Sequence, residues 1–218
     1  MKKLLIPVLC CLVATWSCGF ESSYYVENAQ DIVTILEHQL VNDNGVVYTL
    51  SEKAVASLPD LEEDKRYYIV FDILNQQYQI RLRNAIEAHI VTPEELPEQT
   101  EGLGSDPISF QFAQMGRKYL DMGINYYFAA GSDYAHQIKF YCTMENAGSQ
   151  MNIHIYHDGN NENPTTLAEK DIKMDSRIIS IPVSEWKTVN EVNIYCDVLA
   201  KDPATGEQKI TRRMYSLN

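Results

Sequence analysis

Histidines in the second half of the chain are the residues best suited by type to metal binding. His154 and His157 are three positions apart, and Asp158 follows directly. Imidazole nitrogens and carboxylate oxygens are common zinc ligands. In an extended strand, however, positions three apart point to opposite faces, so His154 and His157 share an ion only if the strand ends between them. We expect these rings to bond buried backbone groups, and keep His154, His157 and Asp158 as the candidate metal ligands.

The segment HDGNNENP offers oxygen ligands at alternate positions, namely Asp158, Asn160 and Glu162. Such alternation is typical of calcium loops, but an EF-hand loop has glycine at position six and glutamate at position twelve. Here Gly159 is at position two and Pro164 follows. The segment is therefore predicted to be a polar hairpin turn.

The sequence shows no pattern for covalent or acid–base catalysis. No serine lies in a G-x-S-x-G elbow. The paired acids, such as Glu62-Glu63 and Glu94-Glu95, lie in connections without the apolar surroundings that raise a carboxyl pKa. Acids distant in the sequence could still converge in the fold. We expect no catalytic residue and no cofactor.

Tyrosines on strand-like segments offer the best candidate binding surface. The chain holds 14 Tyr and 2 Trp. Four tyrosines alternate with apolar residues that are predicted to face a core, which places their rings on the outer face. Exposed tyrosine combines apolar area with a polar hydroxyl and suits contact with sugars or proteins. Ordinary β-propensity and cross-strand pairing are the alternative explanation. The four are Tyr127, Tyr141, Tyr156 and Tyr195.

The N-terminus has the pattern of a lipoprotein signal peptide. A basic start, MKK, precedes an apolar run over residues 4–14. This run is shorter than the roughly 20 residues that span a bilayer, as in a secretory leader. The following TWSC, which ends at Cys18, resembles the lipobox of bacterial lipoproteins. Thr15 and Trp16 depart from the commonest lipobox residues, which the looser lipoboxes of Bacteroidetes tolerate. We expect residues 1–17 to be removed and Cys18 to carry the lipid; secretion without a lipid is the alternative.

The charge of the chain limits its partners. The formal net charge is -12, and removal of Lys2 and Lys3 with the leader lowers it to -14. Such an acidic chain lacks the basic patch that neutralises phosphates and is repelled by anionic lipid head groups. We therefore expect no nucleic-acid partner and a membrane attachment that depends on the lipid at Cys18. The predicted location is the outer membrane of the cell envelope, facing either the periplasm or the exterior.

Two further cysteines, Cys142 and Cys196, remain in the mature chain. Each alternates with apolar neighbours, so both thiols are predicted to point into a core. An exported protein can form disulfides. Cys142 and Cys196 are therefore a candidate disulfide, with two buried free thiols as the alternative.

The elements that carry these residues are predicted to be strands throughout, which makes the fold class all-β. Residues 18–91 contain four or five strand-like segments, enough for a small barrel. Residues 92–107 are rich in proline, glycine and acids and are predicted to be a linker. Residues 108–218 contain seven short strands at regular spacing, as in an antiparallel β-sandwich.

Three stretches resemble the NigD-like family of Bacteroidetes lipoproteins. RYYIVFDILNQQYQIRLRNAIEAHIVTPEEL is similar to the end of that family's OB-type domain. KYLDMGINYYFAAGSDYAHQIKFY and MNIHIYHDGNNENP are similar to strands of its β-sandwich domain, although the family usually has His-Asn where this chain has His157-Asp158. The resemblance implies an OB-like barrel followed by a β-sandwich. It implies no activity.

These observations give one main functional hypothesis and two alternatives. The main one is a lipid-anchored envelope protein that acts as a non-catalytic binding or adaptor module for a protein or a glycan. The alternatives are an envelope hydrolase with a site assembled between the domains, and an immunity-type factor of a bacteriocin locus, after which the family is named. An enzyme predicts a cleft where carboxylates or a histidine converge, whereas a binding module predicts an exposed aromatic patch.

Overall fold

The computed structural model describes residues 25–51, 61–183, 186 and 188–217. These residues form strands with two short 3-10 helices, η2 (Asn146–Gly148) and η3 (Glu169–Asp171). In the part of the chain so described, no helix is long and apolar enough to cross a membrane. The all-β class predicted from the sequence is confirmed. The strands are β1 (Val26–Leu36), β2 (Gln39–Asn42), β3 (Val47–Leu50), β4 (Arg66–Ile73), β5 (Gln79–Ile90), β6 (Glu94–Glu95), β7 (Ile108–Met115), β8 (Tyr119–Ala129), β9 (Gln137–Glu145), β10 (Gln150–Asp158), β11 (Ile172–Pro182), β12 (Glu191–Lys201) and β13 (Gln208–Leu217).

The first five strands form a closed barrel. They pair in the order β3-β2-β1-β4-β5, and an additional pairing of β3 with β5 closes the ring. The core of the barrel is built from alternate residues of these strands, such as Val33, Ile69 and Ile80, which are fully buried. β4 is buried over most of its length, because its sequence RYYIVFDI is apolar on both faces at most positions.

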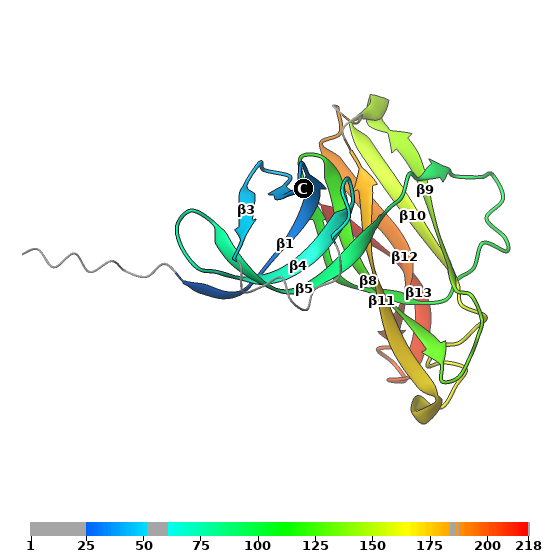
Figure 1. Ribbon diagram of the computed structural model, residues 1–218. Helices are drawn as coiled ribbons and strands as arrows, with labels where there is room; N and C mark the ends of the chain where they lie inside the picture. Colours follow the sequence, from blue (N-terminus) through cyan, green and yellow to red (C-terminus); the bar gives the residue numbers. More distant parts are fainter. Residues whose placement is uncertain (1–24, 52–60, 184–185, 187, 218) are drawn as a thin grey trace, which may run out of the picture.

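The barrel and the sandwich share one continuous sheet. The last residues of β5 pair in parallel with β11, and β8 and β7 follow, which gives sheet A eight strands. Sheet B has the order β13-β12-β10-β9-β6 and packs against the β11-β8-β7 part of sheet A. Figure 1 shows the barrel on one side and sheet B on the side of the sandwich farther from it.

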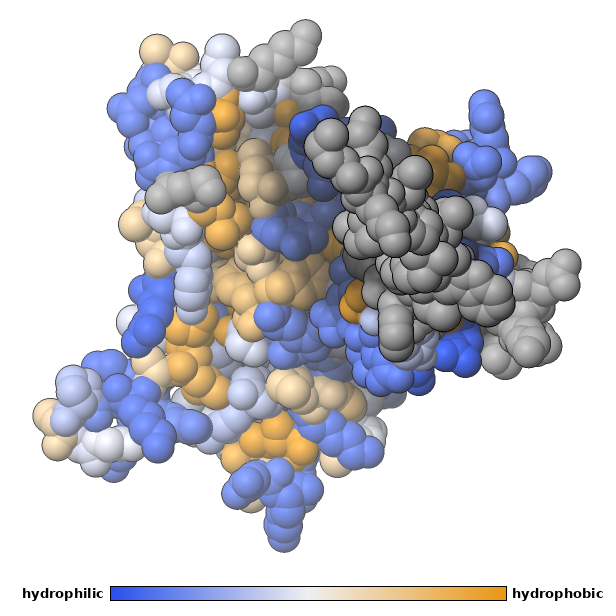
Figure 2. Space-filling model, turned by 90° about the vertical axis from the view of Figure 1, so that its left-hand side faces the viewer, coloured by the Kyte–Doolittle hydropathy of each residue, from blue (hydrophilic) through white to orange (hydrophobic). Residues whose placement is uncertain are grey.

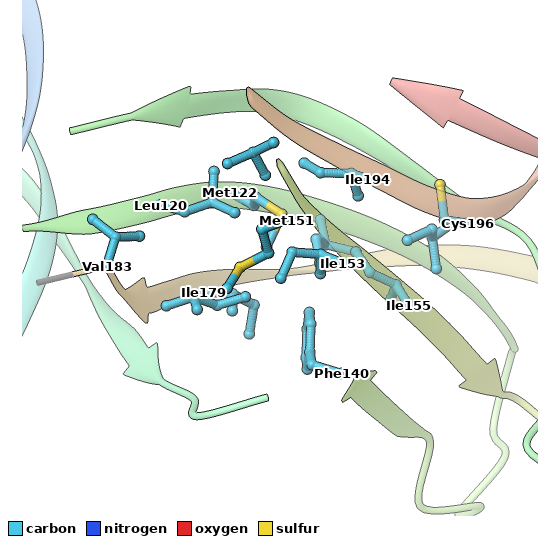
Figure 3. Packing of buried hydrophobic residues seen from close by; sticks show 14 of the residues in the cluster. Leu120, Met122, Phe140, Met151, Ile153, Ile155, Ile179, Val183, Ile194 and Cys196 are labelled. Carbon is cyan, nitrogen blue, oxygen red and sulfur yellow. The ribbon is translucent and has the colours of Figure 1, made fainter. Parts of the chain in front are cut away.

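The core of the sandwich lies between the two sheets. Fully buried residues of β8, β10 and β12 meet here, among them Met122, Ile153 and Ile194, as Figure 3 shows. Successive residues of a strand point to opposite faces, so each of these strands also presents a second set of side chains on its outer face. That outer set is where the candidate site lies.

Residues 92–107, predicted to be a linker, run along the sandwich. They contain β6, which pairs in parallel with β9 at the edge of sheet B. Near their end, the buried carboxylate of Asp106 accepts hydrogen bonds from the backbone N–H groups of Gly159 (2.8 Å) and Asn161 (3.1 Å). The domain boundaries at residues 91 and 108 stay predictions.

Candidate functional site

Three of the four candidate tyrosines lie together on the outer face of sheet B. Tyr141, Tyr156 and Tyr195 come from the neighbouring strands β9, β10 and β12, whose opposite face packs into the core. His154 lies between Tyr141 and Tyr195 in the strand register. The tyrosine face is defined here as Tyr141, His154, Tyr156, Tyr195 and Arg212.

The aromatic rings of the tyrosine face are held against one another. Tyr141 and Tyr156 meet edge to face with ring centroids 5.9 Å apart, and His154 stacks on Tyr195 at 4.9 Å with planes only 9° apart. The Arg212 guanidinium lies 4.3 Å above the centre of the Tyr156 ring. Stacking and cation–π contacts of this kind fix ring orientation. The face is therefore a pre-formed aromatic platform.

Polar groups border this platform. Arg212 Nη1 donates to Asp197 Oδ2 at 2.7 Å. Burial raises the pKa of Asp197, which Arg212 opposes. Two buried asparagines lie side by side on the same face of the sheet, with Asn193 Nδ2 donating to Asn152 Oδ1 at 3.2 Å. Burial also lowers the pKa of His154, with a further contribution from Arg212, which favours the neutral imidazole.

Exposure differs across the tyrosine face. Tyr156, Tyr195 and His154 are half-buried, whereas Tyr141 is only 7% exposed. Half-buried rings next to amide and carboxylate groups can offer both stacking area and hydrogen bonds to a ligand.

Tyr127 does not join this face. It belongs to β8 of sheet A, where it pairs with Met174 of β11. It lines a separate groove of about 580 Å³ together with Leu167 and Ile172. Alternation along one strand predicts which residues share a face of that strand, but not which sheet the strand joins.

The candidate disulfide is not formed, because Cys142 and Cys196 are both free thiols. Both pack into the sandwich core as expected. Cys142 is paired with Ile153 of β10, and Ile194 of β12 is paired with Ile153 from the other side. The strand β10 thus separates the cysteine-bearing strands by two spacings, about 9.6 Å, beyond the roughly 7 Å that a disulfide allows between Cα atoms. Burial raises the pKa of the Cys196 thiol to about 12.

A second cluster, the histidine pair, joins two rings at one end of the sandwich. His136 Nδ1 and His157 Nε2 are 3.0 Å apart, and the rings stack with centroids separated by 5.2 Å. Gly159 is required here, since a Cβ at this position would lie 2.9 Å from His136 Nδ1 and from His157 Cε1. His157 points to the core side of β10 and His154 to the outer side, as their spacing predicted.

The histidine pair is buried and only partly hydrogen-bonded. His157 Nδ1 has no hydrogen-bond partner among the described residues, and His136 Nε2 lies 3.5 Å from Glu162 Oε2, a long contact. Burial, with the neighbouring His136, lowers the pKa of His157 to about 4. Ser132 Oγ donates to Glu162 at 2.6 Å and is the main cause of the lowered Glu162 pKa. Ser132 thus bonds to the Glu162 carboxylate and not to a histidine.

The candidate metal ligands do not converge. His154 lies on the opposite face of β10 from His157, and Glu162 turns toward Ser132 instead of the other oxygens of its turn. Over residues 25–51, 61–183 and 188–217, no three His, Cys, Asp or Glu side chains are grouped to hold a metal ion.

A third cluster, which sequence reasoning missed, lies where the barrel meets the sandwich. The fully buried Arg66 of β4 forms ion pairs with Asp43 (2.8 Å) and Asp121 (2.9 Å). Its Nε donates to Ser180 Oγ at 3.1 Å, and its guanidinium lies 3.7 Å above the Tyr119 ring. Both carboxylates are engaged by the arginine, so the cluster joins the two parts of the molecule. Burial raises the pKa of Asp121, and Arg66 opposes this effect.

Residues 1–17 and Cys18, the predicted leader and lipidation site, lie outside the described residues.

Comparisons with known proteins concern the fold. Neither a family model nor a curated protein sequence matches the chain. Several solved structures are similar to the chain over most of its length. A protein of unknown function from Bacteroides vulgatus is 13% identical with a TM-score of 0.60, over 87% of this chain and 91% of that one. A candidate lipoprotein from Bacteroides fragilis is 9% identical with a TM-score of 0.55, over 87% and 97%.

A NigD-like immunity protein from Bacteroides caccae is similar as well. It is 15% identical with a TM-score of 0.53, over 89% of this chain and all of that one (100%). Identities this low establish a shared fold and no shared activity. The chain therefore has the fold of a NigD-like protein, which confirms the sequence resemblance at the level of the fold.

Proposed function

We propose that this chain is a lipid-anchored cell-envelope protein that binds a ligand on the tyrosine face and catalyses no reaction. The observation that carries the proposal is the aromatic platform of His154, Tyr156 and Tyr195. Its stacked rings do not pack into the sandwich core, because the opposite face of the same strands forms that core. Aromatic groups that are pre-formed, half-exposed and bordered by polar side chains are typical of binding surfaces.

The chemistry of the face favours a neutral glycan. Ring faces stack on the apolar faces of sugars, while the Arg212–Asp197 pair and the tyrosine hydroxyls can bond to sugar hydroxyls. The formal net charge of -12 disfavours acidic ligands. The alternative ligand for the same face is a protein. The name of the Bacteroides caccae protein states an immunity role for that protein, and such a role here would make the ligand a peptide.

The anchor is supported by the leader pattern ending at Cys18 and by the candidate lipoprotein among the similar structures. Membrane fractionation of the native host tests it. Wild-type protein is expected to sediment with the outer membrane and Cys18→Ala to become soluble. A Cys18→Ala protein that still sediments would contradict the anchor.

An array of neutral glycans tests the ligand class with the soluble Cys18→Ala protein. Binding that a Tyr156→Ser/Tyr195→Ser variant loses and a Tyr127→Ser variant keeps would support the proposal. Binding only to proteins or peptides would shift it to the protein ligand, and binding that depends on Tyr127 would overturn it.

A further inference from the structure

A buried carboxylate holds the start of β1 to the barrel. Asp72, whose side chain is 0% exposed, accepts a hydrogen bond from Arg83 Nε at 2.7 Å and from the backbone N–H of Asn28 at 3.2 Å. Arg81 Nη2 forms an ion pair with Asp72 at 3.0 Å and donates to the Tyr25 hydroxyl at 2.9 Å. Hydrogen bonds from Arg83, from the Asn28 backbone and from Arg81 lower the pKa of Asp72 to about 2. Tyr25, the first described residue, is therefore held to the barrel at this point.

This point lies at the end of the barrel that is farthest from the sandwich. Val26 pairs with Ile73, directly before the turn at residues 74–78 that joins β4 to β5. Figure 1 shows the start of β1 and this turn at one extreme of the molecule and sheet B toward the other. From the turn, β5 runs from Gln79 to Ile90, where it meets β11. At about 3.3 Å per residue, the two ends of β5 are separated by up to about 36 Å.

The predicted tether is short compared with this length. Cys18 and Tyr25 are separated by seven positions in the sequence. Fully extended, seven residues span at most about 25 Å. A lipid on Cys18 therefore keeps the barrel tip close to the bilayer, and the sandwich can approach it only if the whole molecule tips over.

The barrel tip also carries side chains that suit a lipid surface. Tyr25 is 43% exposed and Tyr78 40%, and the side chains of Arg81 and Arg83 are 47% and 44% exposed. Tyrosine and arginine place an apolar body and a polar tip at the level of lipid head groups. Figure 2 looks onto this end of the molecule and shows mostly hydrophilic residues, with small hydrophobic patches, beside the grey atoms.

From these observations we infer that the barrel tip, defined as Tyr25, Tyr78, Arg81 and Arg83, faces the lipid head groups of the anchoring membrane. The tyrosine face of sheet B then points away from that membrane, toward ligands in the space beyond it. This inference rests on the proposed lipidation of Cys18.

Energy transfer from the protein to the membrane tests this orientation. Full-length lipidated protein is reconstituted into phosphatidylethanolamine vesicles that contain an acceptor-labelled lipid. A donor dye is attached to Gln76→Cys, in the barrel-tip turn, or to Glu101→Cys, in the connection that follows β6 at the edge of sheet B; both positions are exposed. Burial raises the pKa of the native thiols Cys142 and Cys196, which limits their labelling.

We expect several-fold higher transfer efficiency from position 76 than from position 101. Equal efficiencies, or higher efficiency from position 101, would overturn the orientation while leaving the anchor intact. Flotation of the vesicles separates the two proposals. If the full-length protein does not float with the vesicles, the lipid anchor is wrong and the orientation falls with it.

Discussion

The two faces of sheet B differ although the same strands build them. On the inner face, Ile153 and Ile194 are fully buried in the sandwich core. On the outer face, the adjacent His154 and Tyr195 are half-buried and stacked on each other. The inner residues are chosen by volume and hydrophobicity, whereas the outer rings contribute little burial and carry polar groups. The pleat thus separates the residues that stabilise the sheet from those available to bind a ligand.

The largest expected difference between the faces is in stability. Ile194→Ala removes a fully buried side chain and should lower the free energy of unfolding by about 2–5 kcal/mol. Tyr195→Ala removes a half-buried ring from the outer face and should cost about 1 kcal/mol. Urea unfolding monitored by circular dichroism measures both. Equal losses of unfolding free energy in the two variants would show that the outer face stabilises the sheet as much as the inner face does, and would contradict the proposed difference between the faces.

The two histidines of β10 extend the comparison to pH. The folded-state pKa of His157 is about 4, below the usual value near 6.5, so the unfolded state binds the proton more readily. Above about pH 6.5 the ring is neutral in both states, and protonation of His157 does not reduce the free energy of unfolding. As the pH falls from 6.5 to 4, the free energy of unfolding decreases by up to about 3 kcal/mol.

Unfolding curves across this range test the effect, and the slope of stability against pH is the quantity compared. His157→Gln should flatten that slope between pH 6.5 and 4. His154→Gln, from the outer face, should flatten it less, since its ring is more exposed. Parallel slopes for wild type and His157→Gln would rule out this role for His157.

A smaller effect is expected within the outer face itself. Arg212→Gln removes the cation–π contact with Tyr156 and the ion pair with Asp197, which should cost about 1 kcal/mol because the arginine is partly exposed. It should also raise the pKa of Asp197 further, because Arg212 opposes the effect of burial. An NMR titration of Asp197 measures this pKa.

The matched control is Lys209→Gln, since Lys209 forms an exposed ion pair with Asp202 in the same β12–β13 hairpin. This change should leave the free energy of unfolding nearly unchanged, because solvent screens the exposed pair. If Arg212→Gln behaves like Lys209→Gln in both measurements, the outer face is less ordered than its stacking geometry indicates.

Alternation within strands made much of this structure predictable. The inward positions of Cys142 and Cys196 and the opposite orientation of His154 and His157 follow from the two-residue repeat. That repeat does not determine which strands become neighbours. Sequence patterns therefore placed Tyr127 with the outer-face tyrosines, and they did not determine whether Cys142 and Cys196 form a disulfide.

Contacts between distant segments were not predictable at all. Arg66, Asp121 and Ser180 come from strands of both parts of the molecule and meet only because β5 and β11 pair in parallel. His136 likewise meets His157 beside Gly159, where a Cβ would crowd both rings. No local pattern marks such partners, since each residue is unremarkable among its own neighbours in the sequence.

The central claim is that the tyrosine face binds the ligand, and calorimetric titration tests it most directly. The soluble Cys18→Ala protein is titrated with the glycan that binds most strongly on the array. The account predicts that Tyr156→Ser/Tyr195→Ser weakens binding at least about tenfold while the protein stays folded, consistent with the loss of stacking worth about 1.4 kcal/mol or more. It also predicts that Tyr127→Ser leaves affinity unchanged. Unchanged affinity for the double variant, or a loss confined to Tyr127→Ser, would contradict it.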